Sequence, residues 1–213
     1  MIKDKYSDLK ELRIERIKHR YHKLIQGMQT FQTELKNFLI EDAVRSQDMC
    51  ISSTYLVFDQ RDFRKNQKKP KNLTLLGYVT ITNDAISLNA TLKETFIAKG
   101  INYKSLPALK IGRLCVDDRY LKRNIGKLVI AFCIKRACWL NMQSACRFIT
   151  LDAKRNPFRN KDSLHFYTKI GFKILDHKGK SKDELIKKTS GETPMYFDIY
   201  HILKSLPNLN TTC

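Results

Sequence analysis

The stretch that decides the fold of this chain is Arg113 to Lys127, RLCVDDRYLKRNIGK. It starts in an apolar, strand-like run that stops at Val116, continues through a short polar turn, and leads into a helix that begins near Gly126. The first backbone N–H groups of a helix have no intrahelical partner, and the positive end of the helix dipole lies behind them. Such a strand–turn–helix predicts a pyrophosphate site, although the same connection is often only structural.

Small and basic residues in this turn favour an anion site. Gly126 lets the backbone approach a phosphate closely, because it has no Cβ atom. Lys122, Arg123 and Lys127 bring positive charge to the same position. A pyrophosphate-bearing ligand is one interpretation of the turn, and a plain structural connection is the other.

Outward from this stretch, strand-like and helical patterns alternate along the second half of the chain. We predict strands from β-branched and aromatic runs, and helices from apolar residues at helical spacing. Residues 60–72 are expected to form an exposed, basic hairpin loop, residues 84–107 a weakly patterned stretch with a short helix, and residues 176–193 a charged loop. The remaining expected elements are helices at 9–28, 34–46, 126–140 and 163–169, and strands at 53–58, 75–82, 109–116, 148–151, 172–175 and 195–200.

The N-terminal residues 1–28 are interpreted as an amphipathic basic helix, and residues 29–213 as a single domain. Apolar side chains recur at helical spacing between residues 9 and 28, with lysine and arginine on the other face. This basic face and the 61–71 segment are either surfaces for RNA or simply solvated. The alternation of strands and helices in the rest of the chain predicts an α/β sheet with helices on its faces.

The composition is typical of a globular protein, with 42% hydrophobic and 29% charged residues. No apolar run reaches the length of about 18 residues that a spanning helix needs, and the N-terminus is too charged for a signal peptide, so we expect a cytoplasmic protein away from membranes. The six cysteines form no C-x-x-C pair, which predicts free thiols without a disulfide or a metal site. The net charge of +19 favours polyanionic partners such as RNA, or reflects a lysine-rich composition and a solvated surface.

The run VDDRYLKRNIGKLVI, residues 116–130, resembles the central acetyl-coenzyme A motif of the GNAT N-acetyltransferases. That motif reads [Q/R]-x-x-G-x-[G/A], and alignment on Gly126 places Leu121 at the Gln/Arg position and Asn124 at the middle glycine. Asparagine tolerates the left-handed conformation better than most residues, whereas Leu121 removes one side-chain contact. The resemblance implies that the cofactor is bound by the strand end and the turn, which comprise Leu114, Cys115, Val116, Leu121, Lys122, Arg123, Asn124, Ile125, Gly126 and Lys127.

A second segment, Asn160 to Phe172 (NKDSLHFYTKIGF), resembles the family pattern N-x-x-A-x-x-x-Y-x-x-x-G-F. The resemblance implies that Tyr167 protonates the departing thiolate and that Asn160 contacts the pantetheine arm. An aromatic side chain that only packs on the sheet is the alternative for Tyr167. Together the motifs cover about residues 34–203 and imply a GNAT-like fold: a mixed, largely antiparallel central sheet, flanked by helices and splayed at the central strands.

Residues 34–60 and the tripeptide Gly112-Arg113-Leu114 are also similar to a GNAT branch that includes the aminoacyl-tRNA-acetylating toxins. The resemblance implies that acetyl-CoA donates an acetyl group to a primary amine by direct attack in a ternary complex, with no metal. The amine belongs to an aminoacyl-tRNA, a protein or a small molecule, and both an RNA partner and a homodimer stay open.

Several polar residues have more than one interpretation. The general base is Asp117, Asp118, Asp84 or water, and the first two carboxylates could equally help to start the helix. Cys115 lies in an apolar strand, which favours burial over a nucleophilic role. Three basic residues either hold the 3′-phosphate of coenzyme A, guide RNA, or are solvated: Arg155, Arg159 and Lys161.

The departures at Leu121 and Asn124 motivate a rival hypothesis, a catalytically silent GNAT-fold module that binds acyl-CoA or RNA without turnover. A plain nucleic-acid-binding protein would rest on charge alone, because the chain has no recognisable reading helix or aromatic platform.

Overall fold

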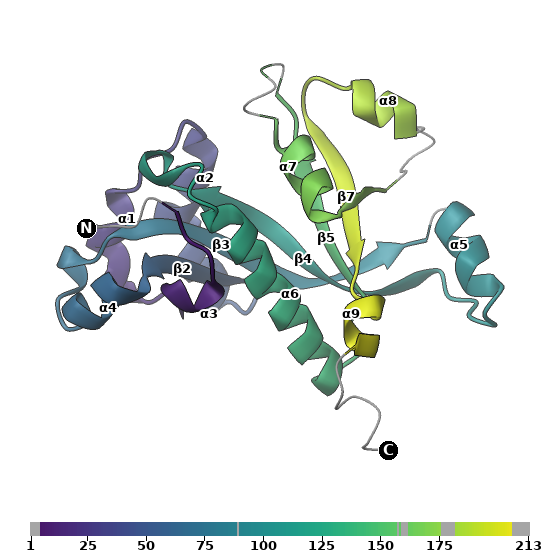
Figure 1. Ribbon diagram of the computed structural model, residues 1–213, viewed down its shortest axis with the longest axis horizontal. Helices are drawn as coiled ribbons and strands as arrows, with labels where there is room; N and C mark the ends of the chain where they lie inside the picture. Colours follow the sequence, from purple (N-terminus) through teal and green to yellow (C-terminus); the bar gives the residue numbers. More distant parts are fainter. Residues whose placement is uncertain (1–4, 89, 157, 159–161, 176–181, 206–213) are drawn as a thin grey trace. The chain divides into compact units, whose positions relative to one another are not determined.

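The computed structural model describes residues 5–88, 90–156, 158, 162–175 and 182–205 (Figure 1). The chain forms two compact units, the first made of Met1–Thr82 with Ile111–Cys133 and the second of Asn83–Lys110 with Ile134–Cys213. Three elements continue from one unit into the other: β3 (Leu75–Ser87), β4 (Ser105–Val116) and α6 (Ile125–Gln143).

Seven strands of the described residues form a sheet in the order β1-β2-β3-β4-β5-β7-β6. The β1–β2, β2–β3, β5–β7 and β6–β7 pairs are antiparallel. The predicted fold class, an α/β protein with a largely antiparallel sheet and flanking helices, is confirmed, and the splay at the central strands stays a prediction. The other strands are β1 (Leu12–Arg16), β2 (Ser53–Asp59), β5 (Phe148–Lys154), β6 (Lys173–Ile174) and β7 (Glu192–Asp198).

The predicted helix at residues 9–28 is wrong, because this segment contains a strand. The 3-10 turn η1 (Leu9–Glu11) leads into β1, and the 3-10 turn η2 (His19–Tyr21) leads into the short helix α1 (His22–Gln26). β1 pairs with β2 in register from Leu12 opposite Asp59 to Arg16 opposite Tyr55. The segment forms a strand because its backbone hydrogen bonds to β2, some forty residues away, outweigh the local preference for a helix. The spacing of apolar residues alone does not reveal this tertiary pairing.

The connection between β2 and β3 is also more ordered than the expected hairpin loop. It contains helix α4 (Gln60–Asn66) and the 3-10 turn η4 (Pro70–Asn72). Asp59 caps α4, because its side chain accepts hydrogen bonds from the amides of Arg61 and Asp62. Phe63 anchors the helix, with 4% of its surface exposed.

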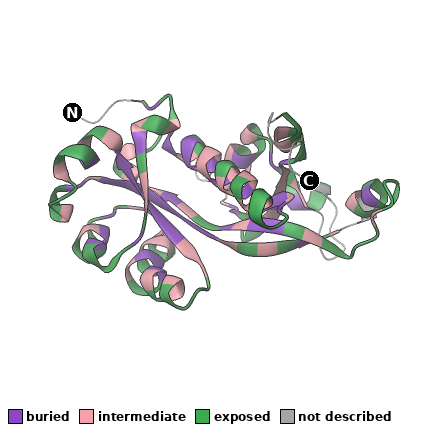
Figure 2. Cartoon of the chain, turned by 90° about the horizontal axis from the view of Figure 1, so that it is seen from below, coloured by how far each residue is buried: buried purple, intermediate pink, exposed green. Residues whose placement is uncertain are grey.

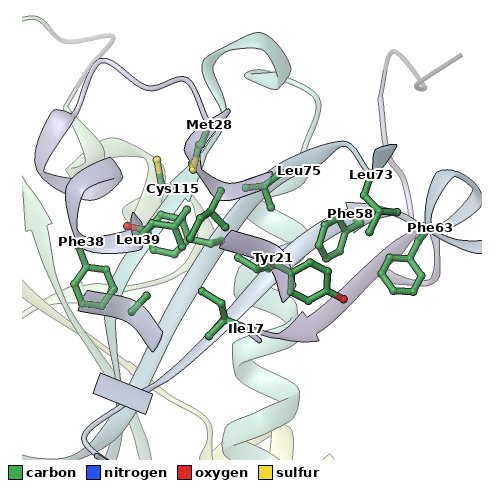
Figure 3. Packing of buried hydrophobic residues seen from close by; sticks show 14 residues of the cluster. Ile17, Tyr21, Met28, Phe38, Leu39, Phe58, Phe63, Leu73, Leu75 and Cys115 are labelled. Atoms are coloured by element: carbon green, nitrogen blue, oxygen red, sulfur yellow. The ribbon is translucent and has the colours of Figure 1, made fainter. Parts of the chain in front are cut away.

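Long antiparallel strands and a broken helix enclose the core of the first unit. β2 is buried along nearly its whole length, and β3 is buried from Leu75 to Ile81 (Figure 2). The predicted helix at 34–46 is confirmed as α2 (Thr33–Asn37), a π-helical turn η3 (Phe38–Asp42) and α3 (Ala43–Asp48). Apolar side chains from these elements pack with others from residues 17–28, from the β2–β3 connection and from β4. Figure 3 labels Ile17, Tyr21, Met28, Phe38, Leu39, Phe58, Phe63, Leu73, Leu75 and Cys115 of this cluster.

The second unit carries the C-terminal half of the sheet. Helix α7 (Ser163–Ile170) packs on β5 (Figure 1). Helix α5 (Ala90–Ile97) lies in the stretch where a short helix was expected, and Phe96 packs with Ile86, Ala108 and Phe148 in a small core. Two further helices, α8 (Lys182–Lys187) and α9 (Tyr200–Ser205), were not predicted.

Candidate functional site

The turn between β4 and α6 has an unusual backbone. After β4 ends at Val116, a 3-10 turn η5 (Asp118–Tyr120) precedes two non-glycine residues in the left-handed region, Lys122 at φ 62° and Asn124 at φ 67°. The left-handed conformation that asparagine tolerates is therefore present at Asn124. The same conformation at Lys122 had no sequence signal, and a lysine in that region marks a turn whose shape is imposed by its surroundings.

The first turn of α6 suits an anionic group. The N–H of Leu128 donates to the carbonyl of Asn124 at 3.2 Å, so the amides of residues 125–127 precede this first helical bond. The first turn contains no acidic residue, although helix N-termini usually attract them. Lys122 and Lys127 are exposed beside these amides, and Arg123 is half-buried. Donor amides and three cations together match the chemistry of a pyrophosphate.

Asp117 anchors the start of this turn. Its carboxylate is fully buried and accepts hydrogen bonds from the amide of Gln29 at 2.9 Å and from Nε and Nη2 of Arg119 at 2.8 and 2.7 Å. Burial opposes ionisation, but the hydrogen bonds from Arg119 and from backbone amides outweigh it and lower the pKa of Asp117. These bonds hold Asp117 as a structural anion, which favours the alternative that it shapes the helix start over the hypothesis that it is the general base.

The same turn is tied to the connection between α1 and α2. The amide of Asp118 donates to the carbonyl of Gln29 at 2.8 Å, and the amide of Phe31 donates to Oδ2 of Asp118 at 2.7 Å. Arg119 adds a bond from Nη2 to the carbonyl of Gly27 at 3.1 Å. Asp118 therefore has a structural role, and the contribution of Asp118 or Asp84 as a base stays a hypothesis.

The end of β4 lies tightly against β3. A Cβ atom on Gly77 would collide with the carbonyl oxygen of Cys115, and the amide of Asp117 donates to the carbonyl of Leu76 at 2.9 Å. Burial raises the pKa of the Cys115 thiol to about 11, and only 5% of this residue is exposed. The expected burial of Cys115 is confirmed, and the raised pKa disfavours the reactive thiolate form.

Tyr167 lies on α7 in the second unit. Its ring is 8% exposed and packs against Phe166 and Phe172, with ring centroids 5.0 and 5.6 Å away. Asp162 caps the helix, and Gly171 ends it in the left-handed region at φ 108°. The helix and glycine turn expected from the second motif are present, whereas Asn160, Arg159 and Lys161 lie outside the described residues.

Arg155 is not a solvated loop residue. Its side chain is 5% exposed and pairs with Asp162 at 3.0 Å. It also donates to the carbonyls of Leu185 and Ile186 and to the hydroxyl of Thr193. The hypothesis that Arg155 holds a phosphate is wrong, because these contacts engage the guanidinium within the second unit.

The structure brings together, in the first unit, the strand end Leu114–Val116 and the turn and helix start Leu121–Lys127. It adds one residue that the sequence analysis missed: Tyr6 hydrogen bonds with Arg123 and Asn124. Its partners lie more than a hundred residues away, so no local pattern points to this contact. In the part of the chain that the structure describes, no group of three or more His, Cys, Asp or Glu side chains is placed to hold a metal, and no helix is long and apolar enough to cross a membrane.

Comparison with known proteins finds solved toxin structures whose fold is similar to that of this chain. A tyrosine-to-phenylalanine mutant of the toxin AtaT matches with a TM-score of 0.66 and 19% identity, over 91% of this chain and 92% of that chain. A tyrosine-to-phenylalanine mutant of KacT matches with a TM-score of 0.66 and 18% identity, over 91% and 98% of the two chains. AtaT complexed with acetyl-methionyl-tRNAfMet matches with a TM-score of 0.66 and 19% identity, over 90% and 96%.

The chain has the GNAT fold. No protein-family model and no curated protein matches the sequence. The likeness is thus one of fold.

Proposed function

We propose that this protein is an acetyl-CoA-dependent N-acetyltransferase that acetylates a primary amine by direct attack. The observation that carries the proposal is the turn before α6. Lys122 and Asn124 adopt left-handed φ angles there, and the first turn of the helix that follows has cations nearby and no acidic side chain. A solved structure of AtaTR bound with AcCoA has the same fold, with a TM-score of 0.65 and 20% identity over 90% of this chain and 96% of that chain, which supports the choice of ligand.

Each part of the proposed site has a physical task. The amides of residues 125–127 and the cations Lys122, Arg123 and Lys127 bind the pyrophosphate. The backbone of Leu114–Val116 forms hydrogen bonds to the pantetheine arm, with Asn160 as a further contact, and Leu121 lies at the edge of the turn. Because the backbone supplies most of these donors, the side-chain departures from the GNAT motif weaken binding without abolishing it.

The transfer itself needs a neutral amine, a polarised thioester carbonyl and a proton for the leaving thiolate. Acetyl-CoA supplies the activated acetyl group, and Tyr167 donates the proton to the thiolate as general acid. An α-amine has a pKa of about 7.7–8, so a sizeable fraction is neutral near pH 7.5 without a dedicated base. Holding donor and acceptor together supplies much of the rate.

The acceptor that we favour is the α-amine of an aminoacyl-tRNA. The net charge of +19 suits a polyanion, and AtaT, which has the same fold, has been solved complexed with acetyl-methionyl-tRNAfMet. A protein amine is the alternative acceptor. Acetylation of charged tRNA against acetylation of a basic peptide, each followed with radiolabelled acetyl-CoA, separates the two.

The first test is the melting temperature with and without acetyl-CoA. A ligand at 100 times its dissociation constant stabilises the native state by about 2.7 kcal/mol. For a chain of this size, that gain raises the melting temperature by roughly 5–10 °C. Gly126→Val and Lys127→Glu should reduce the increase, whereas Lys135→Glu, the same charge change on an exposed residue further along α6, should leave it intact. No increase for the unaltered protein at millimolar acetyl-CoA would refute the cofactor site.

A catalytically silent acyl-CoA-binding module is the second candidate, and one observation favours it: Leu121, at the Gln/Arg position of the motif, is 47% exposed and offers no hydrogen bond. Tyr167→Phe separates the candidates. An enzyme should lose at least about tenfold in turnover while its affinity for acetyl-CoA stays within twofold. Binding of acetyl-CoA with no acetyl transfer to any charged tRNA, peptide or polyamine by the unaltered protein would identify the silent module.

A further inference from the structure

Tyr6, which precedes β1, contacts the proposed pyrophosphate turn (Leu121–Asn124) through two hydrogen bonds that involve its backbone N–H and C=O groups. Its amide donates to the carbonyl of Arg123 at 3.1 Å. Its carbonyl accepts from the side-chain amide of Asn124 at 3.0 Å. The two bonds join Tyr6 to two consecutive residues of the turn, immediately before α6 begins.

Tyr6 is itself held in place by its side chain. The ring is completely buried, and its hydroxyl donates to Oδ2 of Asp59 at 3.0 Å. Asp59 is 6% exposed, and its other oxygen caps α4 through the amides of Arg61 and Asp62. A continuous chain of hydrogen bonds therefore runs from the end of β2 through Tyr6 to the turn.

The turn needs such support because of its backbone. Lys122 and Asn124 both adopt left-handed φ angles, which L-residues with a side chain adopt only against a steric cost. A conformation of this kind persists where the surrounding structure over-determines it. The GNAT motif has glycine at the Asn124 position, and glycine has no side chain with which to bind Tyr6. In this chain, the asparagine both adopts the left-handed conformation and bonds to the N-terminal segment.

We propose that Tyr6 is a positioning residue for the pyrophosphate site. It fixes the Leu121–Asn124 turn, through Asn124, in the conformation that aims the amides of residues 125–127 at the anion. This inference rests on the proposed function, because it assigns to the N-terminal segment a role in binding acetyl-CoA. It gives Tyr6 a role at the site as well as in the core.

The decisive measurement is the dissociation constant of acetyl-CoA, obtained by calorimetry, beside the melting temperature of each ligand-free variant. Tyr6→Phe removes the bond to Asp59 and keeps the ring. Asn124→Gly keeps the left-handed conformation accessible and removes the bond to the carbonyl of Tyr6. Tyr21→Phe is the matched control: Tyr21 is also completely buried in the first unit, and its hydroxyl donates to Glu15 at 2.9 Å.

We expect Asn124→Gly to raise the dissociation constant roughly tenfold and Tyr6→Phe roughly threefold, the range set by the loss of a single hydrogen bond. Tyr21→Phe should lower the melting temperature as Tyr6→Phe does and leave the dissociation constant unchanged. Because Tyr6 acts through Asn124, the double variant should bind acetyl-CoA no more weakly than Asn124→Gly alone.

Three results would overturn the inference: dissociation constants within twofold of the unaltered protein for both variants, an equal weakening in Tyr21→Phe, or additive effects in the double variant. In each case the unaltered protein still binds acetyl-CoA, so the proposed acetyl-CoA site stands and only the role of Tyr6 is lost. If the unaltered protein does not bind acetyl-CoA, the proposed function fails, and the inference fails with it.

Discussion

Single carboxylates set the shape of the turn that follows β4. Asp117 is fully buried and is surrounded by donors from Arg119, from the amide of Gln29 and from the amide of Arg119. These bonds join Arg119 and the amide of Gln29 to the same two oxygen atoms. The Asp117 carboxylate therefore has a structural role. A buried charge is costly and is stable only while all of its hydrogen-bond partners are present.

We predict that Asp117→Asn destabilises the protein by about 2 kcal/mol at pH 7, since charge-assisted hydrogen bonds are lost. The folded-state pKa of Asp117 is lowered, so its contribution is present above the ordinary aspartate pKa and is lost as the pH falls through the folded-state value. Urea unfolding at pH 7 and at pH 3 should show the difference between the two proteins shrinking at the lower pH. Asp42→Asn, on an exposed residue, is the control, and a difference that grows at pH 3 would contradict the prediction.

Residue roles that depend on local chemistry could be predicted from the sequence, whereas roles that depend on distant partners could not. The tolerance of Asn124 for a left-handed backbone and the burial of Cys115 follow from residue chemistry and local pattern. The burial of Arg155 does not, because two of its partners are backbone carbonyls of α8, which any sequence can supply, and its other partners Asp162 and Thr193 are brought near by the fold. Tyr6 likewise depends on Asp59 and Asn124, which only the tertiary fold brings near.

At the scale of elements, helix ends and edge strands are where the fold is most sensitive. α7 ends at Gly171, which has φ 108°, and a Cβ atom there would lie 3.2 Å from the ring of Phe197. The glycine therefore meets two requirements at once, a left-handed backbone and a close approach to β7. Gly100 shares the first requirement, at φ 75°, and has open space around it.

We predict that Gly171→Ala costs about 2 kcal/mol of unfolding free energy and Gly100→Ala about 1 kcal/mol. Both alanines are strained by the positive φ angle, but only the first also pushes on Phe197. Urea denaturation of the two variants measures the difference. Equal costs would show that the ring of Phe197 moves aside freely.

Among the strands of the described residues, β1 is the one that the sequence analysis missed, and its side chains offer a test. In the structure Ile14 is half-buried and sits opposite Val57 of β2. We predict that Ile14→Glu destabilises the protein by about 1 kcal/mol, as expected for a charge on a half-buried strand position. Lys10→Glu, on an exposed residue, should have little effect, and thermal unfolding of both variants checks this. Equal stabilities of the two variants would contradict the prediction.

At the scale of the whole molecule, the long apolar run of α6 and the alternating segments around it made the fold class predictable, whereas β1 and the ordered β2–β3 connection depend on pairing between distant segments. The net charge of +19 is a property of the complete chain that no single element explains. If the acceptor is tRNA, this charge acts on the encounter between enzyme and acceptor.

We predict that the apparent affinity for charged tRNA falls by about a hundredfold or more between about 50 and 200 mM salt, because binding releases counterions from many phosphates. The affinity for acetyl-CoA, which has few charges, should fall much less. Michaelis constants for both substrates over this salt range measure the two slopes. Equal slopes would argue for a small or uncharged acceptor.

The continuation of β3 and β4 between the two units has a consequence for synthesis on the ribosome. The first unit needs residues up to Thr82 and also Ile111–Cys133, so the emerging chain cannot complete it until the second stretch has been translated. Until Val116 has been translated, β3 has β2 on one side and no β4 on the other, which leaves a long strand edge open. The nascent polypeptide should therefore bind chaperones most strongly when translation has passed Thr82 and has not yet reached Cys133.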